Sequence, residues 1–312
     1  MSHLLPAIRA LASFEPPAAL PPCDLGELAP VLVAHGLASM ASWQVEHTRL
    51  AADVPEAFRE TLLTVYQGTV NDNVLRLMTL RNALRDAPDV PVVLLDGAAW
   101  IDWLYPHMAF RPVSDLRLAV RGRDGAAFAA AIGQGMKPVR TGDGGRTAVF
   151  SDGQLELLLQ EGLWSGGAED EALFARAVPV KVFGPKVARP APEEALLGVV
   201  GDLAQAALWA PLIRYVDLRE LLRLGVDASY VKARAHSAGL SRALYGASVL
   251  VAWFFPEVAD AAAAVRPELG HVERALLEPV IDGARDPAKL RHLRGAEAAA
   301  RALVAPHGKG NG

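Results

Sequence analysis

The chain has 312 residues, with 31 Lys and Arg against 35 Asp and Glu, so its formal net charge is −4. Hydrophobic residues make up 52% and charged residues 21%, a composition that excludes an intrinsically disordered chain. The mild acidity gives no basis for non-specific binding to nucleic acid or to an anionic membrane.

Cysteine content and hydropathy indicate a cellular compartment. The single cysteine, Cys23, excludes an intramolecular disulfide and a multi-cysteine zinc site. The first residues contain no basic segment followed by an apolar run and a cleavage site, so we expect no secretory leader. The longest apolar stretch, Ala243 to Phe255, is shorter than the roughly 20 residues that a membrane span needs. These features predict a cytoplasmic protein.

Residues 1–87 are predicted to form an N-terminal helical region. Prolines between Pro16 and Pro22 interrupt it, because each proline fixes φ and removes a backbone donor. A second interruption follows at Pro88. Between the two, apolar residues recur at helical spacing and predict a long helix that packs through one face: Phe58, Leu62, Val65, Val74, Leu77 and Leu84.

Residues 88–190 change to a mixed pattern and are predicted to form an α/β core. The run from Pro91 to Gly97 indicates a buried strand, and Ser114 to Val120 alternates as a half-buried strand does. A short helix is expected within 124–135. Arg146 to Gln160 predicts two strands joined at the turn Asp152-Gly153. Val180 to Gly184 is interpreted as one more strand.

Residues 191–305 are predicted to form a C-terminal helical region, followed by a disordered tail at 306–312. Helices are expected at 212–224, at 228–255 with an interruption at Gly239, and at 272–304. Asp217 lies near Arg214 and Arg219 on the first of these helices and is interpreted as part of a surface ion pair worth about 0.5 kcal/mol. The expected fold class is therefore α+β, with a mixed sheet between two helical regions.

Several common catalytic motifs are absent from the sequence. It contains no GxxxxGK[ST] phosphate loop, no GxGxxG following a strand and no GxSxG elbow. The eight histidines do not show the HxxxH or HExxH spacing that places two metal ligands on one helix face. The informative segment is Val90 to Val120, which is predicted to form a strand ending in glycine, a helix, and a strand that begins with a carboxylate. Such a carboxylate can hold Mg²⁺ that is bound to a phosphate.

This segment resembles the bacterial uncharacterised nucleotidyltransferase family, a branch of the polymerase-β-like nucleotidyltransferase superfamily. The family pattern is strand, Leu-Lys-Gly, helix, Tyr-Pro, and then Arg-Pro-x-x-Asp-x-Asp before a hydrophobic strand. The matching segments are Leu95-Asp96-Gly97, Tyr105-Pro106 and Arg111 to Arg117. The resemblance continues through a strand entry at Gly135 to Val139, the strand Leu155-Glu156-Leu157 and the helix Arg214 to Leu222, and covers about residues 60–260.

The resemblance implies a catalytic site. In active members, the two acids of Asp-x-Asp and a third acid hold two Mg²⁺ ions for transfer of a nucleoside monophosphate from an NTP. By this correspondence Asp115 is the first acid, Glu156 is the third, and Gly97 lies against the phosphates. Arg111 either positions a phosphate or forms a salt bridge with Asp115. The alternative for Asp115 is an acid that caps a turn, and the alternative for Glu156 is an acid that faces solvent without a role in the site.

Two residues depart from the family pattern with opposite changes of charge. Arg117 replaces the second acid of Asp-x-Asp, and Asp96 replaces the lysine before the glycine. Two unit charges about 4 Å apart interact by roughly 4 kcal/mol at an effective dielectric near 20, so a permanent guanidinium competes severely with a metal. The reciprocal exchange also suggests an ion pair between Asp96 and Arg117 across the site.

These features favour a degenerate, catalytically impaired nucleotidyltransferase-fold protein that binds a nucleotide, another phosphorylated ligand or a protein partner. The alternative is an active enzyme that transfers a nucleoside monophosphate to a small molecule or peptide. It would use Mg²⁺ on Asp115 and Glu156, or a substitute acid such as Asp96, Asp102 or Asp152. A third possibility is a structural scaffold. No nucleic-acid or membrane partner is expected.

Overall fold

The computed structural model describes residues 3–15, 17–85, 87–101, 103–142, 145–164, 171–286 and 294–306. The chain forms two compact units. We call Met1–Thr69, Ala109–Arg111 and Val199–Gly312 the helical unit, and Val70–Met108 and Pro112–Gly198 the sheet unit. The sheet unit thus contains the expected α/β core of 88–190 except for Ala109–Arg111, together with segments on both sides of it. The tail expected at 306–312 lies outside the described residues from 307 onward.

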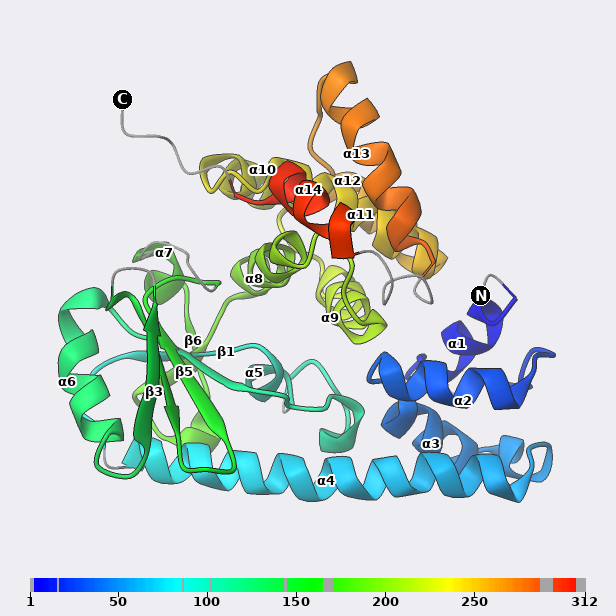
Figure 1. The fold of residues 1–312 in the computed structure, drawn as a ribbon, viewed down its shortest axis with the longest axis horizontal. Coiled ribbons are helices and arrows are strands. Elements are labelled where there is room, and N and C mark those ends of the chain that lie inside the picture. Colours follow the sequence, from blue (N-terminus) through cyan, green and yellow to red (C-terminus); the bar gives the residue numbers. More distant parts are fainter. Residues whose placement is uncertain are drawn as a thin grey trace. The chain divides into compact units, whose positions relative to one another are not determined.

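The sheet unit is built on one mixed seven-stranded sheet with the order β3-β4-β5-β2-β1-β7-β6 (Figure 1). Parallel pairs form between β1 and β7 and between β2 and β5, and the other neighbours are antiparallel. Its strands are β1 (Val92–Leu95), β2 (Leu116–Ala119), β3 (Lys137–Gly142), β4 (Thr147–Ser151), β5 (Glu156–Gln160), β6 (Val178–Pro179) and β7 (Val187–Arg189). This architecture confirms the predicted α+β class.

Of the two strands that carry the family motif, β1 is buried as predicted, and β2 is more buried than its sequence indicates. All four residues of β2 are buried, so the expectation of a half-buried strand is wrong. The reason is that β2 is a central strand between β1 and β5, and its polar residue Arg117 is buried together with an acidic neighbour.

The turn at Asp152-Gly153 is confirmed: Asp152 Oδ1 accepts hydrogen bonds from the backbone N–H of Gln154 (2.9 Å) and Leu155 (2.8 Å).

The strand expected at Val180 to Gly184 is wrong. Lys181–Phe183 forms a 3₁₀ turn, η4, between the short strands β6 and β7. Gly184 closes this turn at φ +96°, a conformation that residues other than glycine rarely adopt. Lys181 and Val182 are both on the surface, whereas consecutive side chains of a strand would point to opposite faces.

Short helices complete the sheet unit. They are α5 (Gly97–Trp100), α6 (Gly122–Ile132), which packs against β5, and α7 (Glu171–Ala175). The 3₁₀ segment η2 (Met108–Phe110) leads toward β2. The expected helix within 124–135 corresponds to α6.

Helix α4 (Glu56–Arg85) begins in the helical unit and ends in the sheet unit. The buried face of α4 contains polar as well as apolar residues: Leu62, Thr69, Asn73, Leu80 and Leu84. Val74, which the apolar pattern assigned to the packed face, is 40% exposed. The apolar residues alone therefore placed Val74 incorrectly and missed Thr69 and Asn73, whereas Leu62 and Leu84 are buried as predicted.

The helical unit contains the remaining helices, and α8 (Pro192–Gln205) connects the two units along the chain. The interruption expected near Gly239 is confirmed by the gap between α10 and α11. The elements are α1 (Leu5–Leu11), α2 (Leu25–Ala34), α3 (Ala38–His47), η1 (Arg49–Ala52), α9 (Leu212–Arg223), α10 (Ala228–Ser237), α11 (Ser241–Phe254), η5 (Pro256–Val258), α12 (Ala259–Val265), α13 (His271–Ala284) and α14 (Arg294–Val304). None of the described helices is both long enough and apolar enough to cross a membrane.

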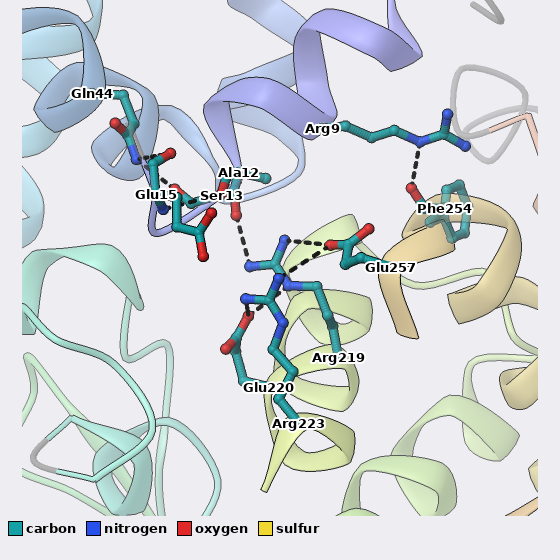
Figure 2. Close-up of polar contacts among 10 residues, drawn as sticks. All are labelled: Arg9, Ala12, Ser13, Glu15, Gln44, Arg219, Glu220, Arg223, Phe254 and Glu257. Atoms are coloured by element: carbon teal, nitrogen blue, oxygen red, sulfur yellow. Dashed lines mark hydrogen bonds and ion pairs between the residues drawn. The ribbon is translucent and has the colours of Figure 1, made fainter. Parts of the chain in front are cut away.

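A buried arginine joins the N-terminal and C-terminal segments of the helical unit (Figure 2). Arg219 on α9 is 1% exposed, donates to the carbonyl of Ala12 (2.7 Å) and contacts the carboxylates of Glu220 and Glu257. Arg9 on α1 donates through Nε to the carbonyl of Phe254 at the end of α11 (2.6 Å). Because buried guanidinium groups need partners of this kind, Arg219 is a structural residue of the helical unit and not a surface charge.

Candidate functional site

The motif residues meet at one edge of the sheet. In the antiparallel pair β1–β2, Leu95 is opposite Arg117, and in the parallel pair β2–β5, Leu116 is opposite Leu157. The carboxyl end of β1 therefore lies beside the amino ends of β2 and β5. This register brings Asp96, Asp115, Arg117 and Glu156 to the same end of three neighbouring strands.

The ion pair predicted between Asp96 and Arg117 is present. Nη1 of Arg117 lies 3.6 Å from Oδ2 of Asp96, and the two side chains are 8% and 4% exposed. Nε of Arg117 lies 3.6 Å from Oδ2 of Asp115, whose side chain is 40% exposed. Arg117 is thus placed between two carboxylates, where its charge compensates theirs. We call Asp96, Asp115 and Arg117 the ionic triad.

Asp96 occupies its place in the triad with an unfavourable backbone conformation. Its φ of 57° and ψ of −151° lie close to a region that is populated mainly by glycine. A residue held there carries strain of about 1–3 kcal/mol, which the surrounding structure must offset. The strain arises where β1 turns sharply into α5, and this turn directs the carboxylate of Asp96 toward β2.

Asp115 and Glu156 occupy equivalent positions on adjacent strands. Because Leu116 is opposite Leu157, the residues that precede them lie side by side, and the alternation of side chains places both on the face that Arg117 shares. Glu156 is exposed, and Asp115 accepts a hydrogen bond from Ser114 Oγ (2.7 Å). The register thus places the two acids at the same end of adjacent strands, while their role as metal ligands stays a prediction.

The donor set does not fit two Mg²⁺ ions. Within the described part of the chain, no group of three His, Cys, Asp or Glu residues is arranged so that it could hold a metal ion. The position that should supply the second acid supplies a guanidinium, which is already paired with the first acid. Since Mg²⁺ is held by oxygen ligands of negative charge, the triad opposes the two-metal arrangement of active superfamily members.

The substitute acids do not complete the set. Asp96 is buried against Arg117, and the carboxylate of Asp152 accepts hydrogen bonds from two backbone N–H groups, which lower its pKa. Asp102 lies outside the described residues. Gly97 is buried in the first turn of α5, a helix of only four residues, and its expected contact with phosphates stays a prediction.

Arg111 and Asp217 form a second buried pair, within the helical unit. Nε of Arg111 donates to Oδ1 of Asp217 and Nη2 donates to Oδ2, both over 2.9 Å, and the side chains are 4% and 0% exposed. The interpretation of Asp217 as a surface ion pair is therefore wrong. Arg111 does form a salt bridge, but the alternative that named Asp115 as its partner is wrong, because the carboxylate that it meets is that of Asp217.

A sequence signal for this burial existed. Ten of the twelve residues of α9 are buried, and its apolar residues occupy more than one face of the helix. A helix that is apolar on several faces is enclosed by other elements, so its charged residues need buried partners. The spacing of Asp217 from Arg214 was a weaker signal than the apolar residues on either side of it.

Sequence reasoning missed Asn73, which holds the loop before β2. Its side-chain N–H donates to the carbonyl of Met108 (2.7 Å), and its Oδ1 accepts from the backbone N–H of Val113 (2.9 Å). Asn73 is fully buried in the middle of α4, where asparagine is a poor helix former. That unfavourable position was the available signal, and the contacts identify Asn73 as a residue that positions the strand carrying Arg117.

The comparison with known families agrees with this geometry. The sequence matches the family described as Uncharacterised nucleotidyltransferase over residues 21–256, which is more than half of the chain. No curated protein and no solved structure matches the chain. The motif residues, the mixed sheet that assembles them and the extent of the match lead to one conclusion: the chain belongs to the uncharacterised nucleotidyltransferase family.

Proposed function

We propose that this protein is a catalytically impaired member of the family and that it acts by binding rather than by nucleotidyl transfer. The observation that supports the proposal is the ionic triad, in which Arg117 stands at the second acid position and lies 3.6 Å from both Asp96 and Asp115. Arginine is never deprotonated in proteins, so this charge is permanent. Two-metal catalysis by the usual route is therefore disabled.

The ligand classes that fit this proposal are a nucleotide or other phosphorylated small molecule, and a protein partner. A phosphorylated ligand bound at the triad would have to be held without a metal. The two carboxylates beside Arg117 compensate its charge, which weakens its attraction for phosphate. This argument favours a protein partner over a nucleotide.

One observation favours a second candidate function, an active nucleotidyltransferase. Asp115 and Glu156 lie side by side, and both are accessible to solvent. Two adjacent carboxylates can take part in holding one Mg²⁺ ion, with waters or phosphate oxygens as further ligands. Binding of a single ion at this position would have to compete with the attraction between Arg117 and Asp115.

The experiment is a calorimetric titration of ATP, GTP, CTP and UTP into the full chain, once with Mg²⁺ and once with EDTA. A transfer assay with labelled nucleotides runs in parallel. The proposal predicts no binding that requires Mg²⁺ and no transfer of label. Binding that EDTA leaves unchanged would identify a metal-independent nucleotide ligand, and Mg²⁺-dependent binding with turnover would establish the enzyme.

A reciprocal variant provides the positive control. Asp96→Lys together with Arg117→Asp restores the lysine and the second acid of the family pattern, and so removes the guanidinium from the site. We expect this variant to gain Mg²⁺-dependent nucleotide binding that the wild type lacks. Arg123→Asp is the control for the Arg117→Asp half of this variant, because it replaces an arginine by an aspartate at a side chain that is 75% exposed on α6.

A further inference from the structure

The sheet unit contains a groove that shares no residue with the ionic triad. It lies between the last turns of α4 and the η4 turn, has a volume of about 890 Å³, and its lining includes Met78, Arg81, Arg85, Lys181, Val182 and Lys186. We call it the α4–η4 groove. The η4 turn leads into the amino end of β7, and β7 runs parallel to β1 with Val187 opposite Val92. The η4 turn therefore lies at the end of the sheet where β1 begins, whereas Asp96 lies at the end where β1 stops.

The wall formed by the η4 turn is held in place by the chain itself. Lys186 Nζ donates to the carbonyls of Ala87 (2.7 Å) and Pro88 (3.2 Å), so the turn is tied to the segment that leaves α4. The backbone N–H of Val180 donates to the carbonyl of Val187 (2.9 Å) and closes the turn at its base. The shape of the groove therefore exists before any ligand binds, which lowers the entropic cost of binding.

The groove is positively charged on an acidic protein. Its lining carries four cations, Arg81, Arg85, Lys181 and Lys186, and one acid, Asp89, which gives 4 − 1 = +3. The rest of the chain has 31 − 4 = 27 basic and 35 − 1 = 34 acidic residues, a net charge of −7. A concentration of cations on such a background attracts an anionic ligand and sets its orientation.

The groove is also apolar at positions that face solvent. Met78 is 59% exposed on α4, and Val182 is 60% exposed on the opposite wall. Leu75 (45% exposed) and Val74 (40% exposed) extend the apolar surface one turn back along α4. Methionine adapts to differently shaped apolar partners, and apolar anchors surrounded by charges are typical of a surface that binds a peptide.

We propose that the α4–η4 groove binds an acidic peptide segment of a partner protein, whose apolar side chains cover Met78 and Val182 while its carboxylates pair with Arg81, Arg85 and Lys181. This proposal rests on the proposed function, that the protein acts by binding, and adds the chemistry of the partner. A nucleotide or nucleic acid fits less well, because its phosphates gain nothing from contact with exposed Met78 and Val182.

The test is a selection of random peptides of about twelve residues, long enough for about three helical turns, on the full chain. We expect the enriched peptides to contain both acidic and large apolar residues. Their affinities are then measured by fluorescence anisotropy for the wild type and for two groove variants. One is Arg81→Glu with Lys181→Glu, and the other is Met78→Ser with Val182→Ser.

Each groove variant should weaken binding about tenfold or more, as expected when anchor residues of an interface are removed. The matched control, Arg123→Glu, changes an exposed cation on α6 outside the groove and should leave the affinity within about twofold. Circular dichroism of every variant checks that it is folded. All four substituted groove residues are exposed, so the fold should tolerate the changes.

Four outcomes would overturn the proposal: no enriched peptides, enrichment without acidic residues, affinities that both groove variants leave unchanged, or equal competition by ATP or a single-stranded oligonucleotide. Light scattering that shows self-association abolished by the same variants would replace the partner protein with a second copy of the chain. The labelled-nucleotide assay is independent of the groove. Turnover by the wild type would refute the impaired-enzyme proposal without affecting peptide binding, and loss of peptide binding would not create turnover.

Discussion

Two buried Arg–Asp pairs in this protein differ in geometry and in what they do. In the helical unit, Arg111 and Asp217 form a bidentate pair with two contacts of 2.9 Å and almost no exposure. In the sheet unit, Arg117 lies 3.6 Å from Asp96 and equally far from Asp115, which is 40% exposed. The first geometry is that of a structural salt bridge, and the second is that of a charge placed among acids.

The difference shows why a buried charge pair has to be interpreted through its neighbours. The Arg111–Asp217 pair satisfies both partners and is enclosed by α9 and the packing around it. The contacts of Arg117 with Asp96 and Asp115 are 3.6 Å long, which exceeds hydrogen-bond length, so these two contacts act mainly through charge. We therefore assign a stabilising role to the first pair, and we propose that the second pair accounts for the impaired catalysis.

Removal of one partner of the structural pair should have the largest effect. Asp217→Ala leaves the Arg111 guanidinium buried without its main counter-charge, so we expect a loss of about 3–5 kcal/mol in the free energy of unfolding. Urea denaturation followed by circular dichroism measures it. Asp282→Ala, which removes an exposed partner of Arg285, is the control and should change the stability by less than about 1 kcal/mol. Similar values for the two variants would contradict the structural assignment.

The triad should show a coupling between Asp96 and Arg117. Arg117→Asp places three acids together and should destabilise the sheet unit, and Asp96→Lys in the same chain should recover part of the loss. We expect a coupling energy of about 1–3 kcal/mol in the double-mutant cycle. Additive effects of the two substitutions would show that Asp96 and Arg117 do not interact energetically.

The strained backbone of Asp96 gives a smaller, separate effect. Both Asp96→Ala and Asp96→Gly remove the carboxylate, but only glycine adopts a φ of 57° and a ψ of −151° without steric conflict. The glycine variant should be more stable than the alanine variant by about 1 kcal/mol. Equal unfolding free energies would mean that β1 enters α5 without strain.

The turn between β4 and β5 should give the smallest effect, and it should depend on pH. Asp152 accepts hydrogen bonds from two backbone N–H groups, and these bonds hold the pKa of its carboxyl below the ordinary value. Its contribution is therefore complete above the pKa of the unfolded chain and is lost as the pH falls through the lower pKa of the folded chain. Asp152→Ala should cost about 0.5–1 kcal/mol at pH 7 and nothing below both pKa values, measured by urea denaturation at each pH. A loss that does not change with pH would contradict the capping role.

The sequence predicted the ionic pair of the triad because both of its residues lie within one recognisable motif. The strand order and the register of β1, β2 and β5 were not predicted, and they come from the structure. The Arg111–Asp217 pair was not predicted, since its residues are 106 positions apart and only the packing of the helical unit brings them together. Asn73 was missed for a similar reason, because its hydrogen bonds go to a loop that is distant in sequence.

The η4 turn shows a different limit of sequence reasoning. Val180 to Gly184 was interpreted as a strand, and this was wrong because Gly184 adopts a positive φ and closes a 3₁₀ turn. In this turn Lys181 and Val182 are both exposed. Apolar pattern alone does not distinguish a residue that packs in the core from one that is presented at a surface.

The central claim is that Arg117 prevents metal binding, and Mn²⁺ titration monitored by electron paramagnetic resonance tests it most directly. Free Mn²⁺ gives the signal, so a bound ion is measured as its loss. We predict that the wild type leaves the signal of free Mn²⁺ unchanged and that the Asp96→Lys, Arg117→Asp variant reduces it, an effect that Asp115→Asn in addition abolishes. Stoichiometric loss of the signal with the wild type, abolished by Asp115→Asn or Glu156→Gln, would contradict the account and restore the protein as a metal-dependent enzyme.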